Sequence, residues 1–203
     1  MNTPTTDFRN SGFSMIEVLI TLIILLTGLL GLAGLQIRAQ QAELESYQRS
    51  QALILISDMA GRIAANRRAT PCYAIGLAYV GNNAAATAAV VPAACAGAGS
   101  AETRAIADSD LLEWSQRLFG SSESYTAGGA TVSVGAMIGA RGCITYVADA
   151  APSTSGVYTV SVAWQGMSNT AAPAVADTCG QNLYGTEAKR RLVKTTVRIP
   201  TLL

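Results

Sequence analysis

The apolar run from Gly12 to Gln40, GFSMIEVLITLIILLTGLLGLAGLQIRAQ, most constrains what this chain can fold into. Between Val18 and Leu35 it contains no charged residue and no proline. At about 1.5 Å per residue, a helix from Phe13 to Ile37 would span roughly 37 Å, which is enough to cross a bilayer. The run also contains Glu17 near its start, where a carboxylate is costly. The segment therefore predicts a membrane helix with a glutamate that needs an explanation.

Three ordinary explanations for an apolar N-terminal segment remain open on these residues alone. A secretory signal peptide has a basic start and a small-residue cleavage site, but Arg9 is partly offset by Asp7, and Leu32-Ala33-Gly34 is a poor site. A plain signal anchor would account for the hydrophobicity but not for Glu17. A helix of a soluble core would normally be shorter.

Composition limits the chemistry that the chain can perform. Its 203 residues are half hydrophobic, which suits one domain with a core in addition to the membrane segment. The formal net charge of +1 gives no broad attraction to nucleic acid. Histidine is absent, which removes the commonest general base and metal ligand. We therefore expect no catalytic residue, no metal, no cofactor and no nucleic-acid partner.

The residues around the acidic position carry a more specific signal. Gly12-Phe13-Ser14-Met15-Ile16-Glu17 resembles the processing site of type IV prepilins. The resemblance implies that residues 1–12 are a leader peptide, that a prepilin peptidase cuts between Gly12 and Phe13, and that Phe13 is then N-methylated. Because the peptidase acts on the chain, the resemblance makes the protein a substrate and not an enzyme.

The same resemblance gives Glu17 a role in assembly. Cleavage would leave Phe13 with an α-amine that is mostly protonated at neutral pH. In a fibre, the Glu17 carboxylate of an incoming subunit would pair with the amine of its neighbour and set the axial register. Apolar surroundings would strengthen this attraction, and neither charge is stable there alone. Alternatively, Glu17 reaches the membrane interface or stays protonated.

Beyond the membrane segment, hydrophobic periodicity predicts the rest of the fold. We expect a transmembrane and assembly helix at 13–37, its amphipathic continuation at 38–66 and a periplasmic globular domain at 67–203. The continuation should bury Leu44, Ala52, Leu55, Ile56, Met59 and Ile63. Polar residues, Gln48 among them, should lie mostly on other faces. Residues 72–107, rich in Ala, Gly and Pro, should be irregular.

The remaining segments predict a short helix and a sheet. Asp110, with Glu113 three residues later, has the pattern of a capping box, so we expect a short helix that starts there and packs Trp114; capping also explains Asp108. Four segments rich in β-branched residues predict the strands of an antiparallel sheet: 130–138, 142–148, 156–164 and 191–199. The charged run Lys189-Arg190-Arg191 should be a solvated sheet edge.

The four cysteines, Cys72, Cys95, Cys143 and Cys179, all follow the membrane segment. No CxxC pair is present, so zinc and thioredoxin-like sites are weakly indicated. An even number of cysteines in an exported domain predicts two disulfides, for which three pairings exist. We prefer Cys72–Cys95 and Cys143–Cys179, because each closes a local loop; free buried thiols are the alternative.

The globular part extends the resemblance to the PilV-like minor pilins of the type IV pilus, through DLLEW, GCITY and GVYTVSVAWQG. It implies an α+β, pilin-like fold, in which a long N-terminal helix packs on an antiparallel four-stranded β-sheet with one short extra helix. A disulfide-bounded loop near the C terminus is common in such pilins.

The implied function is to help to prime pilus assembly and so to support twitching motility and surface adhesion. The implied partners are prepilin peptidase, other minor pilins and the major pilin, the inner-membrane assembly platform and a tip adhesin. The protein would sit in the bacterial inner membrane and then at the fibre tip. Two alternatives stay open: a minor pseudopilin of a type II secretion system, and a membrane-anchored exported enzyme or receptor.

Overall fold

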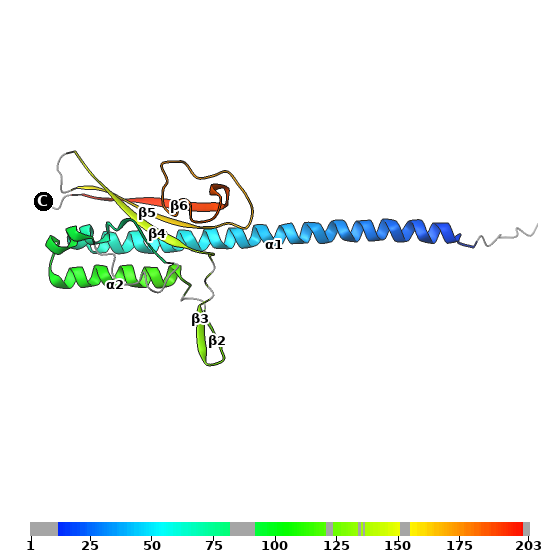
Figure 1. The fold of residues 1–203 in the computed structure, drawn as a ribbon, viewed down its shortest axis with the longest axis horizontal. Helices are drawn as coiled ribbons and strands as arrows, with labels where there is room; N and C mark the ends of the chain where they lie inside the picture. Colours follow the sequence, from blue (N-terminus) through cyan, green and yellow to red (C-terminus); the bar gives the residue numbers. More distant parts are fainter. Residues whose placement is uncertain are drawn as a thin grey trace, which may run out of the picture. The chain divides into compact units, whose positions relative to one another are not determined.

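The fold is seen in a computed structural model that describes residues 12–81, 92–120, 124–133, 135, 137–150 and 155–200. Figure 1 shows the helices and strands of this part of the chain. The chain divides into two compact units, Met1–Glu43 and Leu44–Leu203. One helix, α1 (Met15–Ala65), contributes residues to both. Its end agrees closely with the end near Asn66 predicted from the sequence.

In the first unit, α1 has no covered face. Every described residue from 12 to 43 is exposed, and the apolar stretch has the length and composition to cross a membrane, with none of it buried in the structure. A soluble helix normally buries an apolar stripe against a core. The surface of this segment is instead apolar around its whole circumference, which is typical of a membrane helix.

In the second unit, α1 buries one stripe, namely Gln48, Ala52, Leu55, Ile56, Met59 and Ile63. The predicted stripe is wrong at two positions. Gln48 is only 1% exposed and Leu44 is 40% exposed. Gln48 lies one turn before Ala52 on the same face, so helix geometry buries it despite its polar side chain. Leu44 is the first residue of the unit and lies beyond this packing.

The second unit contains the predicted four-stranded antiparallel sheet, in the order β1-β4-β5-β6. Its strands are β1 (Gly76–Val80), β4 (Arg141–Ala148), β5 (Gly156–Gln165) and β6 (Arg190–Ile199). The 3-10 helices are η1 (Arg67–Tyr73), η3 (Ala93–Gly97) and η4 (Glu187–Lys189). An α+β, pilin-like fold with a long N-terminal helix and this sheet is confirmed.

One predicted strand of this sheet is wrong. None of the described residues between 130 and 138 pairs with it; β3 (Ala130–Ser133) pairs with β2 (Ser124–Ala127) in a separate hairpin. The fourth strand is β1, which lies inside the segment 72–107 that we expected to be irregular. Its five residues, GLAYV, pair with β4. Ala- and Gly-rich flanks hid this short strand, because its stability comes from the neighbouring strand rather than from local propensity.

The second long helix, α2 (Ala101–Leu118), begins nine residues before the predicted start at Asp110. Its N-cap is Ser100, whose Oγ accepts from the Thr103 backbone N–H at 3.3 Å, while Thr103 Oγ1 accepts from the Ser100 N–H at 2.9 Å. Asp108 and Asp110 therefore lie within the helix and cap nothing, which corrects the prediction. Ser-x-x-Thr is a less familiar capping box than the one with Glu or Gln.

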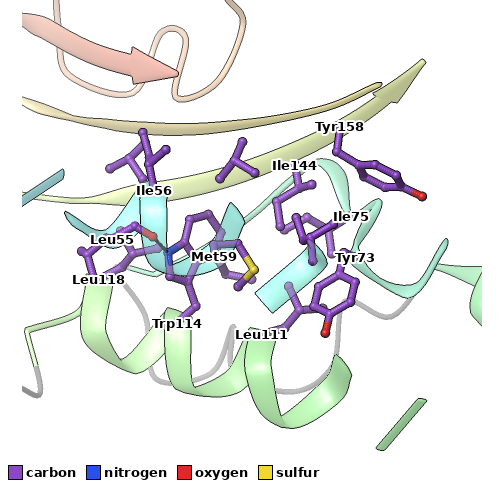
Figure 2. Close-up of a cluster of buried hydrophobic side chains, with 14 of the residues drawn as sticks. Leu55, Ile56, Met59, Tyr73, Ile75, Leu111, Trp114, Leu118, Ile144 and Tyr158 are labelled. Atoms are coloured by element: carbon purple, nitrogen blue, oxygen red, sulfur yellow. Dashed lines mark hydrogen bonds between the residues drawn. The ribbon is translucent and has the colours of Figure 1, made fainter. Parts of the chain in front are cut away.

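The core of the second unit lies between α1, α2 and the sheet (Figure 2). Trp114 of α2 is completely buried, and its Nε1 donates to the Leu55 carbonyl of α1 at 3.0 Å. A Cβ on Gly142 of β4 would lie 2.3 Å from the Trp114 ring. The indole therefore contacts both the helix and the strand, as a packing residue and not as a ligand platform.

Two disulfides connect the elements of this unit, and they are the two pairings preferred from the sequence. Cys72–Cys95 joins η1 to η3, and Cys143–Cys179 joins β4 to the loop before β6. They close loops of 23 and 36 residues. Such cross-links stabilise mainly by restricting the unfolded chain.

Arg190 is buried, although we predicted that the run Lys189-Arg190-Arg191 forms a solvated sheet edge. Its side chain is 1% exposed, with Nε 2.6 Å from a Glu187 carboxylate oxygen. Its Nη1 donates to the Asp177 and Cys179 carbonyls at 2.5 and 3.0 Å. The guanidinium thus fixes the loop that Cys179 also anchors. The prediction was wrong because a run of charges in sequence does not show which side chain points inward.

Candidate processing and assembly site

The predicted cleavage position lies just outside α1. Gly12 and Phe13 are exposed, Phe13 by 84%, and neither is helical. The Ser14 carbonyl accepts from the N–H groups of Glu17 and Val18 at 3.0 and 3.3 Å, which closes the first turn. A peptidase needs an accessible, non-helical bond, and the Gly12–Phe13 peptide has both properties.

Glu17 lies in the first turn of α1. This position favours a carboxylate, because the unpaired N–H groups at a helix start carry partial positive charge. Glu17 shares a shallow surface depression with Phe13, Val18 and Thr21. The carboxylate therefore lies on the same side of the helix as the residue that cleavage would make N-terminal.

The two threonines of the apolar segment are satisfied within the helix. Thr21 Oγ1 donates to the Val18 carbonyl at 2.9 Å, and Thr27 Oγ1 lies 3.0 Å from the carbonyls of Ile23 and Ile24. Such bonds let a hydroxyl enter a bilayer at little cost. Within the described residues Glu17 has no such partner, and it is the only charged side chain between Phe13 and Ile37.

A network of charges in the second unit joins α1 to α2. Arg62 of α1 lies 2.7 Å from Asp110 and from Glu113, and 3.0 Å from Asp58. Burial lowers the pKa of Arg62, but its bonds to Glu113 and Asp110 outweigh this, so the pKa is raised. Arg62 in turn lowers the pKa of Glu113. Burial and the 2.5 Å bond to Asp110 raise the pKa of Tyr73.

A second ion pair ties the start of this unit to the sheet. Arg191 Nη2 lies 3.0 Å from Glu45 Oε1, which also accepts from the backbone N–H and hydroxyl of Ser168. Burial raises the pKa of Glu45, but the bonds from Ser168 and Arg191 outweigh it, and the pKa is lowered. Sequence reasoning missed both networks, because Arg62–Asp110 and Glu45–Arg191 pair residues far apart in the chain.

Two family models match adjacent parts of the chain. The prokaryotic N-terminal methylation motif matches residues 7–33, which include Gly12, Phe13 and Glu17. The model of the Tt1218-like type IV pilins matches residues 34–112. The chain is a type IV pilin-like prepilin. No curated protein and no solved structure shows significant similarity to this prepilin.

Membership in this class has direct consequences for the prepilin. It implies processing by a prepilin peptidase and assembly into pili with other pilins. It is also consistent with membrane anchoring by the N-terminal helix before assembly. The individual roles of Gly12, Phe13 and Glu17 stay predictions. The structure brings these three residues together at the start of α1, whereas the four cysteines belong to the second unit.

Proposed function

We propose that this prepilin is a minor pilin of the type IV pilus. In this proposal the peptidase cuts between Gly12 and Phe13 and methylates Phe13, residues 13–37 anchor the protein and then assemble, and residues 38–66 continue the helix into the globular domain at 67–203. The chain is a structural subunit and not a catalyst. The observation that carries the proposal is the exposed apolar helix with an unpartnered Glu17 in its first turn, directly after the cleavage motif.

Electrostatics explains why the glutamate would drive assembly. A carboxylate at the centre of a membrane helix costs about 2.5–3.5 kcal/mol on insertion scales and less near an end. Trimming frees the Phe13 α-amine, a matching positive charge about one turn away. In the fibre the Glu17 carboxylate pairs with this amine on a neighbouring subunit. Because the pair forms only at one axial offset, it selects the register.

The minor-pilin assignment draws on the globular unit. Two motifs shared with PilV-like minor pilins, GCITY and GVYTVSVAWQG, lie on the adjacent strands β4 and β5. We place the subunit with other minor pilins, the major pilin, the inner-membrane platform and a tip adhesin. It helps to prime the fibre, remains near its tip and so supports twitching motility and adhesion. Before assembly the globular domain faces the periplasm.

Processing is tested by expressing the full chain with and without a prepilin peptidase and measuring intact masses. We expect a product that begins at Phe13 and carries one added methyl group only when the peptidase is present. A chain that keeps residues 1–12 under both conditions would contradict the proposal.

The pilus role needs a separate test, because a type II secretion pseudopilin would be processed in the same way. Deleting the gene should sharply reduce surface pili, counted by electron microscopy, and abolish twitching. Loss of protein secretion with normal pili would instead identify the pseudopilin. Complementation with the intact gene is the control.

A further inference from the structure

The second unit contains a cavity of about 440 Å³ beside η1, lined by residues of η1, β4, β5 and β6. This volume lies in the range of small-molecule sites. Tyr158, at the edge of the core cluster in Figure 2, lines it together with Thr70 and Ile199. These three side chains are at most 8% exposed and form its floor. Arg68 and Tyr146 lie at its rim.

The aromatic wall is held in a fixed geometry. The rings of Tyr146 and Tyr158 have centroids 4.6 Å apart and are tilted by 34°. Tyr146 donates its hydroxyl to the Ser155 carbonyl at 3.2 Å, and a Cβ on Gly156 would lie 2.4 Å from its ring. Tyr146 nevertheless stays 37% exposed. A positioned ring that is open on one side offers a stacking surface at little entropic cost.

The charged side chain that lines the cavity is a cation with no acidic partner among the described residues. None of the described residues that line the cavity is a carboxylate. Within the described parts of the chain, the exposed Arg68 side chain has no ionic or hydrogen-bonded partner. Nearby, Arg104 donates to the Ala98 and Gly99 carbonyls rather than to an acid. A Cβ on Gly99 would lie 2.9 Å from the Arg68 carbonyl, so these residues are neighbours. By contrast, Arg62 and Arg191 each pair with carboxylates.

We propose that this cavity binds a carboxylate carried on a ring with an apolar face. The ring stacks on Tyr146 and the carboxylate pairs with Arg68, whose planar fork matches its geometry. Acidic sugars and aromatic acids share this chemistry, so either is a source of the ligand. The site lies within the globular unit and adds a binding activity to the proposed structural role, on which it does not depend.

The test uses the full chain in a non-ionic detergent, with methyl glucuronide, benzoate and neutral methyl glucoside as probes. Binding is measured by isothermal titration and by saturation-transfer NMR. A probe of this size should bind with a dissociation constant on the order of 1 mM. We expect at least one of the two acids to bind and the neutral glycoside to bind at least about tenfold more weakly. Which acid binds identifies the source.

Matched variants assign the binding to the cavity. Arg68→Gln should weaken acid binding about tenfold or more, whereas Arg67→Gln, next to it and outside the lining, should leave it unchanged. Tyr146→Phe keeps the ring and should keep binding, while Tyr146→Ala should lose it. Circular dichroism checks that each variant folds. The proposal is overturned if neither acid binds the folded wild-type protein, or if Arg67→Gln and Arg68→Gln weaken binding equally.

Discussion

The two halves of α1 are both regular helix, yet they are stabilised in different ways. Residues 15–43 are exposed on every side, while the part from residue 44 to Ala65 buries a stripe in the core of the second unit. Their sequences differ accordingly. The first half is apolar all round as far as Leu35, and the second alternates apolar and polar faces.

This difference shows that a single chain leaves the apolar surface of the first half of α1 uncovered. Burying a side chain such as Leu or Ile is worth about 1.5–3 kcal/mol, and this half has more than a dozen large apolar side chains exposed. Only lipid or neighbouring helices can cover them. The apolar stripe of the second half is covered, since the residues that pack on it belong to the same chain. Changes in the first unit should therefore affect processing and assembly, and changes in the second should affect stability.

The largest expected effect is on processing. Gly12→Ala should leave the full-length precursor in the membrane, because in this interpretation the peptidase requires glycine itself before the scissile bond. Intact mass after co-expression with the peptidase measures this, and the melting temperature of the globular unit should not change. Normal trimming of Gly12→Ala would refute the assigned cleavage site.

The next largest effect is on assembly. Glu17→Ala should still be trimmed at Phe13, but its incorporation into pili should fall about tenfold or more, because the charge that selects register is gone. Immunoblotting of sheared pili against whole cells measures incorporation. Glu17→Gln keeps the shape of the side chain but removes its charge, so its incorporation into pili should fall by a similar factor. Normal yield for both variants would exclude the register role for this subunit.

A matched pair of large-to-small changes tests the two halves directly. Trp114→Ala should destabilise the second unit by about 3–5 kcal/mol, because it leaves a cavity between α1, α2 and β4. Leu25→Ala, at a side chain that is 62% exposed, should leave that unfolding free energy unchanged. Urea denaturation in non-ionic detergent, followed by circular dichroism, compares them. Equal losses of unfolding free energy in the two variants would contradict the different roles assigned to the two halves of α1.

Removing a disulfide should have a similar or slightly smaller effect. Replacing Cys143 and Cys179 together by Ser opens the 36-residue loop and should cost about 4 kcal/mol. Replacing Cys72 and Cys95 opens 23 residues and should cost slightly less. Both double variants should still be trimmed by the peptidase. A processing defect in either would show that the two units are coupled.

The smallest effect concerns the ion pair at the start of the second unit. Glu45 has a lowered pKa in the folded protein, so its stabilisation is present above the unfolded pKa near 4.5 and is lost as pH falls through the folded value. Glu45→Gln should cost about 0.5 kcal/mol at pH 7 after solvent screening. The difference from wild type should shrink below pH 4.5. If the stability difference between wild type and Glu45→Gln stays unchanged at pH 3, it arises from side-chain packing and not from the ion pair.

Local signals predicted the parts of the fold that depend on neighbouring residues. The end of α1, the strands β4, β5 and β6 and the preferred disulfide pairings could all be read from periodicity and spacing. The start of α2 was missed because Asp110 has the pattern of a cap but pairs with Arg62 across the fold. β1 was missed because its short sequence forms a strand only against β4. Arg190 was misplaced because only the folded loop provides its acceptors.

The sequence alone determined the membrane-type helix, the cleavage motif and the position of Glu17, because each depends on composition and spacing within one turn or one apolar run. Only the tertiary structure decided which strand completes the sheet, which charges are buried and which residues line the cavity together with Arg68. Those outcomes depend on contacts between residues tens of positions apart, and their free energy appears only once the chain has folded.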